Sequence, residues 1–186
     1  MTRKRIGWIL PAVVLPYVAL LCMAVVFLRN PVSTWFMKWI FQNNGLLLLA
    51  FFAVFALLSI LLSVLCFVMS LRQQWDPISL AKTAMIVKLI QIPAYLIVFV
   101  IGVLMILSIF TFAFSVLLWV MDCVTLVLTG MLSVAAAIIG NRKQLLSNKE
   151  TIMFSLLQLV FVADVVATIV LYRKLAKQEA LCSTPN

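Results

Sequence analysis

The sequence predicts an all-α membrane protein, a polytopic helix bundle with five transmembrane helices and one amphipathic interfacial helix on the outer side. Two observations predict this class. Hydrophobic residues make up 66% of the 186 positions and charged residues 10%, whereas soluble domains are about half apolar and a quarter charged. In addition, residues 85–140 form an apolar run whose only formal charges are Lys88 and Asp122. As one helix this run would be roughly 84 Å long, but a bilayer core is about 30 Å thick. The run must therefore cross, turn near Phe110–Phe114 and cross back.

The first span is predicted at residues 6–28, directly after the basic residues 3–5. Its apolar run is longer than the roughly 7–15 residues of a signal-peptide core, so we expect an uncleaved helix. Pro11 and Pro16 each remove a helix hydrogen bond, which predicts a kink.

An interfacial helix is predicted at residues 33–43, where aromatic and apolar residues share one face. The second span, residues 46–71, carries small residues at spacings of three and four, the pattern that lets membrane helices approach closely. These small residues are Ala53, Ala56, Ser59, Ser63, Cys66 and Ser70.

Helix starts are visible before two of the later spans. Asp76 is a typical N-cap with Pro77 at the first helical position, and Ser147 with Glu150 forms a capping box. The remaining spans and a polar tail are assigned to residues 85–108, 115–139, 151–172 and 173–186.

The distribution of Lys and Arg favours a cytoplasmic N-terminus. In that orientation nine of these residues flank the inner ends of the five spans and five flank the outer ends. The tail residues Arg173, Lys174 and Lys177 then lie outside, against this trend. The net charge of +9 predicts anionic lipid headgroups as a partner rather than nucleic acid, since the basic residues flank apolar runs.

Three ionisable residues within the spans are candidates for function, because charges are costly in a bilayer. Lys88 lies one turn inside its span, and we expect its side chain to extend to the headgroups. Asp122 and Asp164 have side chains too short to do so, and their spans place them at similar depths.

Polar residues form stripes beside these acids. Asp122 shares one helix face with three hydroxyl residues, and Lys88 shares a face of its own helix with two polar residues. We expect Tyr95 to make a hydrogen bond with Asp164. Helical spacing predicts that Gln158 points away from Asp164. The stripes predict either a polar path or a close-packing seam whose hydroxyls bond their own backbone. Their further members are Thr125, Thr129, Ser133, Gln91 and Tyr95.

Enzymatic chemistry is not expected. The chain contains no histidine, no catalytic or nucleotide-binding motif and no Cys-x-x-Cys pair, so neither a metal site nor a cofactor is predicted.

Three stretches behind the opening TRKRIGWILPAVVLPY resemble a family of small multispan membrane proteins from Firmicutes, for which no activity is characterised. They are residues 79–102, 121–130 and 161–166. In length and helical character the chain is also similar to the substrate-binding subunits of energy-coupling-factor vitamin transporters. Those have six spans and an Ala-x-x-x-Ala motif in the first span, which Ala12, Ala19 and Ala24 do not reproduce.

Two functions remain open at this point. The first is a non-enzymatic integral membrane protein that acts through helix packing as a subunit of a larger complex, with another membrane protein or a second copy as partner. The alternative is a small proton-coupled transporter or carrier whose working groups are Asp122 and Asp164.

Overall fold

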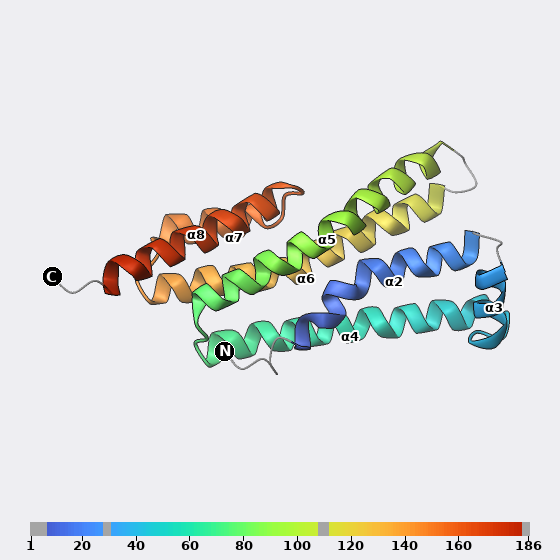
Figure 1. Cartoon of the computed structure of the whole chain (residues 1–186), viewed down its shortest axis with the longest axis horizontal. Coiled ribbons are helices and arrows are strands. Elements are labelled where there is room, and N and C mark those ends of the chain that lie inside the picture. The colour runs from blue at the N-terminus through green and yellow to red at the C-terminus, as the bar shows by residue number, and fades with distance from the viewer. Residues whose placement is uncertain (1–6, 28–30, 108–111, 184–186) are drawn as a thin grey trace.

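All regular structure is helical in the part of the chain that the computed structural model describes, residues 7–27, 31–107 and 112–183 (Figure 1). Four helices are long and apolar enough to cross a membrane, which supports a multi-pass membrane protein; they cover Gly7–Phe27, Gly45–Arg72, Pro77–Ile106 and Phe114–Arg142. The elements in order are η1 (Gly7–Ile9), α2 (Leu10–Phe27), α3 (Pro31–Trp39), α4 (Gly45–Arg72), α5 (Pro77–Ile106), α6 (Phe112–Arg142), α7 (Asn148–Leu157) and α8 (Ala163–Ser183).

The four long helices form an elongated bundle. α2 packs on α4, and α5 packs along α6, while contacts of α2 and α4 with α6 join the two pairs. We call the end with the short helix α3 the α3 end. The opposite end, which holds the connections from α4 to α5 and from α6 to α7, is called the hairpin end (Figure 1).

The predicted fifth span at residues 151–172 is wrong. α7 ends at Leu157 and α8 begins at Ala163, with a turn between them. α7 has 10 residues and is therefore about 15 Å long, half of a bilayer core. α7 and α8 instead form an antiparallel pair, the α7–α8 hairpin, which covers only the part of α5 and α6 nearer the hairpin end (Figure 1). The predicted polar tail is also revised, because α8 continues as a helix to Ser183.

The predicted helix starts are confirmed. The Asp76 side chain accepts a hydrogen bond of 2.8 Å from the Ser79 amide, and the capping box of Ser147 and Glu150 is present in full. These caps satisfy amide groups that a helix leaves unpaired at its start. Of the turn predicted near Phe110–Phe114, residues 110 and 111 lie outside the described residues, and residues 112–114 already belong to α6.

A short helix lies where the interfacial helix was predicted, but its bounds differ. It runs over Pro31–Trp39 instead of 33–43, and the chain turns at Gln42 and Asn43, whose φ angles of 51° and 57° are left-handed. Trp35 and Trp39 are exposed on it, as expected for rings at a membrane surface.

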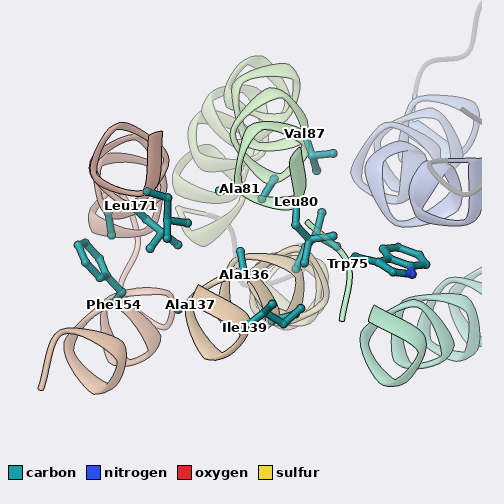
Figure 2. Close-up of a cluster of buried hydrophobic side chains, with 14 of the residues drawn as sticks. Trp75, Leu80, Ala81, Val87, Ala136, Ala137, Ile139, Phe154 and Leu171 are labelled. Atoms are coloured by element: carbon teal, nitrogen blue, oxygen red, sulfur yellow. The ribbon is translucent and has the colours of Figure 1, made fainter. Parts of the chain in front are cut away.

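The main hydrophobic core lies at the hairpin end, where α4 to α8 meet and η1 adds Ile9 (Figure 2). Alanines on α5 and α6, such as Ala81 and Ala136, are fully buried and let the helices approach closely. The predicted small-residue seam of α4 is buried from Ser59 to Ser70, whereas Ala53 is exposed. The larger side chains between the helices include Trp75, Leu80, Ile139, Phe154 and Leu171.

Candidate intramembrane polar site

Lys88 is fully buried, with 0% of its surface exposed, so the expected extension to the headgroups is wrong. The reason is the start of its helix. α5 begins at Pro77, eight residues before the predicted span, which places Lys88 about 16 Å along the helix. A buried ammonium at this depth needs a counter-charge and hydrogen-bond acceptors.

Asp164 supplies that counter-charge. Its Oδ2 lies 2.8 Å from the Lys88 Nζ, and both side chains are almost completely buried. Asp164 lies in the first turn of α8, where the helix N-terminus also favours a negative charge. The α7–α8 hairpin therefore places a carboxylate against the buried side chain of Lys88 on α5.

Gln158 completes the surroundings of Lys88. Its Oε1 accepts a hydrogen bond from the Lys88 Nζ, and this orientation is fixed because the opposite one would direct an amide N–H₂ group at an ammonium. The Gln158 Nε2 bonds no described atom. The prediction that Gln158 points away from Asp164 is wrong, because it assumed one continuous helix. Gln158 is the C-cap of α7, and the turn after it changes its direction.

Thr168 and Ser133 connect this group to α6. The Thr168 hydroxyl lies 2.8 Å from the Asp164 carbonyl and 3.2 Å from the Gln158 Oε1, and it lies 3.1 Å from the Ser133 hydroxyl. We call these five residues, from α5, α6 and the α7–α8 hairpin, the closed cluster: Lys88, Gln158, Asp164, Thr168 and Ser133.

The other hydroxyls of the α6 stripe are used locally. Thr125 donates to the Met121 carbonyl at 2.8 Å, and Thr129 donates to the Thr125 carbonyl at 3.0 Å. Both are buried. The stripe from Thr125 to Ser133 is therefore a packed seam in this conformation, one of the two structures that its pattern predicted.

Gln91 has a different role from the neighbouring Lys88. Pro16 lacks the N–H that would bond the Ala12 carbonyl within α2, and the Gln91 Nε2 donates to that carbonyl at 3.1 Å. The Tyr95 hydroxyl then donates to the Gln91 Oε1 at 3.3 Å. The expected bond from Tyr95 to Asp164 is thus wrong, since Gln91 takes this donor and Lys88 takes the acid.

Asp122 lies apart from the closed cluster, in a groove between α5 and α6 with a volume of about 860 Å³. The groove follows the parts of these helices that the α7–α8 hairpin does not cover, and Phe161 and Val162 of the hairpin turn also line it. Asp164 reaches the groove as well. Asp122 has 7% of its surface exposed, and no described residue makes a hydrogen bond or an ion pair with its carboxyl group.

Comparison with known proteins identifies a family for this chain. A family of unknown function, DUF6652, matches residues 10–177. The chain belongs to this family. No curated protein and no solved structure matches it.

This DUF6652 member offers limited coordination chemistry in the part that the structure describes. Within it, no three Cys, Asp or Glu side chains gather as metal ligands. Cys22, Cys66 and Cys123 are free thiols. The arrangement can hold a buried charge in the closed cluster and can present one carboxyl group, Asp122, to the groove.

Sequence reasoning on this family member missed Gln158 and the pairing of Lys88 with Asp164. A signal for the pairing was present: Asp76-Pro77 marks the helix start, and counting from it rather than from the first apolar residue places Lys88 too deep to reach the membrane surface. No comparable signal marked Gln158, because its contact depends on the turn that follows it.

Proposed function

We propose that this chain is a non-enzymatic integral membrane protein that acts as a subunit of a larger membrane complex. The observation that supports this best is the closed cluster, whose polar side chains tie α5, α6 and the α7–α8 hairpin together instead of lining a path. Little of the described part of the chain lies outside its helices, so its contacts with another membrane protein or a second copy would be made by helix faces. Anionic lipids would contact its basic ends, and nucleic acid has no part in the proposal.

The experiment is to extract the protein with its native lipids into nanodiscs and to measure the particle mass. After the mass of scaffold and lipid is subtracted, a subunit leaves a protein mass above that of the 20.9 kDa chain, which corresponds to a second defined component or further copies. Particles that contain one chain and no other protein under every gentle condition would contradict the proposal.

A pair of matched variants then locates the interface. Leu57 on α4 and Leu104 on α5 are similarly exposed, at 66% and 62%, and neither lines the groove. Each is replaced by Trp in a separate variant. A Trp at an interface overfills it and reduces the particle to a monomer, while the other variant keeps the complex and serves as the control.

We also propose that the N-terminus and the hairpin end face the cytoplasm. The experiment is cysteine labelling of intact cells at Lys143, between α6 and α7, and at Lys38 in α3, in a background with Cys182→Ser. Label from outside is expected only at Lys38. Labelling of position 143 would contradict this orientation.

A second candidate, a proton-coupled carrier, is supported by the fact that Asp122, Asp164 and Tyr95 line one groove. The hydroxyl groups of Thr125, Thr129 and Ser133 are packed between helices and line no open path in this conformation. This function therefore needs another conformation, in which the α7–α8 hairpin moves. In liposomes, Asp122→Asn and Asp164→Asn are expected to abolish proton-dependent solute movement. The candidate fails if the unaltered protein moves neither protons nor solutes across a broad panel.

A further inference from the structure

We propose that the groove between α5 and α6 binds a lipophilic amine in its protonated form, with the ammonium group at Asp122 and the apolar body along the two helices. The inference rests on the groove itself and not on the proposed role as a subunit, since it concerns a ligand of the isolated chain.

The walls of the groove suit an elongated apolar body. They extend from Ile92 to Ile106 on α5 and from Phe112 to Leu126 on α6, about 21 Å on each helix. Leu96 and Trp119 on these walls are exposed, at 63% and 66%. The volume of about 860 Å³ falls within the roughly 300–1,000 Å³ of small-molecule sites, which combine apolar walls with a few polar groups.

The charges of the groove call for a cation. Two carboxyl groups line it, Asp122 and Asp164, and the ammonium of Lys88 balances only the second. Lys and Arg are absent among the lining residues. A carboxylate removed from water without a partner is costly, and an ammonium that donates a charge-assisted hydrogen bond to Asp122 removes that cost.

The four candidate spans of a second copy do not provide this cation. Lys88 is buried in the closed cluster, and the other cations of the four candidate spans lie toward the hairpin-end connections, since Arg72 ends α4, Arg142 ends α6 and Lys82 follows the start of α5 at Pro77. None of these described cations is exposed at the level of the groove.

A continuous partner helix also fits poorly. A transmembrane helix needs about 20 residues, but Phe161 and Val162 at the tip of the hairpin line the groove where the hairpin begins to cover α5 and α6 (Figure 1). The groove therefore runs along only part of the bundle, a length that suits a single-chain amphiphile.

The experiment measures equilibrium binding of radiolabelled dodecylamine to the full chain in nanodiscs of zwitterionic lipid, with empty nanodiscs as the background. Dodecanol, which has the same chain and no charge, is the matched ligand. We expect saturable binding of the amine and only partition of the alcohol. Asp122→Asn should weaken amine binding by roughly tenfold or more, while Asp76→Asn, which removes the same charge from the exposed N-cap of α5, should leave it unchanged.

A second variant keeps the proposal testable if Asp122→Asn does not fold. Val116 lines the groove and is 45% exposed, so Val116→Trp should fill the groove and abolish amine binding while Asp122 remains. Dodecylamine that only partitions into the particles, or that binds Asp122→Asn or Val116→Trp as tightly as the unaltered chain, would overturn the proposal. If the protein is a monomer that binds dodecylamine, the proposed role as a subunit is contradicted and the proposed amine site is supported.

Discussion

Two polar regions along α5 and α6 each hold a buried aspartate, Asp164 of α8 in the closed cluster and Asp122 of α6 in the groove, but only one of these acids has a partner of opposite charge. In the closed cluster Asp164 is 3% exposed and pairs with Lys88. In the groove Asp122 is 7% exposed, and no described cation accompanies it. Burial is therefore nearly equal, and the difference lies in whether the chain supplies the counter-charge. An acid with its own cation holds helices together, whereas an acid without one is available to a ligand.

The largest expected effect comes from removing the acid of the closed cluster. Asp164→Leu leaves the Lys88 ammonium buried without its partner, and loss of one member of a buried pair costs about 3–5 kcal/mol. The free energy of unfolding in mixed micelles measures this. Asp122→Leu, the same substitution in the groove, is the control and should change that free energy by much less. Equal losses would remove the distinction between the two regions.

The same prediction has a second arm. Lys88→Met combined with Asp164→Leu removes both charges, and most of the stability lost in the single variant should return, because an apolar pair of similar volume often replaces a buried ion pair without loss. A double variant that is no more stable than Asp164→Leu would show that the contribution of the cluster does not depend on charge balance.

A smaller effect is expected from removing Gln91, which donates the hydrogen bond that Pro16 cannot donate within α2. Gln91→Leu leaves the Ala12 carbonyl without its donor, at a cost of about 1 kcal/mol in the free energy of unfolding. Pro16→Ala restores the bond within α2, so Gln91→Leu should cost less in that background. A double-mutant cycle measures this coupling, and additive effects would show that Gln91 does not compensate for the hydrogen bond lost at Pro16.

The boundary between the two regions contains a strained residue. Val162, at the hairpin tip beside the groove, has a φ of 67°, a conformation that is unfavourable for a β-branched side chain. It is 75% exposed, so little packing is lost on truncation. Val162→Gly should stabilise the fold by up to about 1 kcal/mol in thermal unfolding. Val162→Ala, which keeps a Cβ in the same conformation, should gain less, and a destabilised glycine variant would argue against strain.

The smallest effect is expected at the far end of the hairpin, where Lys174 pairs with Glu150. The hydrogen bond from the Lys174 side chain holds the pKa of the Glu150 carboxyl below its ordinary value. The pair therefore stabilises the fold at neutral pH, and this contribution is lost as the pH falls below about 4, the ordinary range of Glu, through the lower pKa of the folded state. Both side chains are about one-third exposed, so solvent weakens the pair.

The measurement is the thermal midpoint as a function of pH. The unaltered chain should show a slight fall on acidification that is reduced in Glu150→Gln. The same fall in both would assign it to other groups.

Most of the long helices could be predicted because length and hydropathy dictate them. The apolar runs on α2, α4, α5 and α6 must bury their backbone groups in helices if they lie in a bilayer, and the caps at Asp76 and Ser147 follow from their side chains. The break after Gln158 could not be predicted in this way. Residues that cross a membrane and residues that turn back within it are equally apolar, and the turn at Val162 carries neither Gly nor Pro.

The error at the break explains one of the errors in the site, the direction of Gln158. Helical spacing correctly placed Asp164 and Thr168 on one face, because both lie on α8. It failed for Gln158, because spacing has meaning only within one helix. The location of Asp122 in an uncovered groove could not be predicted from the sequence either, since it depends on how far the hairpin extends along α5 and α6.

The hairpin has a consequence for the two ends of the chain. If the four candidate spans cross the membrane and the hairpin enters and leaves through the same surface, the number of crossings is even and both termini are expected in the same compartment. In that topology the basic residues of α8 and of the two hairpin-end connections are expected on the same side as residues 3–5, whereas Lys38 and, by its place in the sequence, Arg29 are expected on the opposite side. This topology would remove the disagreement between the basic tail and the positive-inside rule. Reporter domains fused to each end should therefore report the same side of the membrane, whereas a chain with five crossings would separate them.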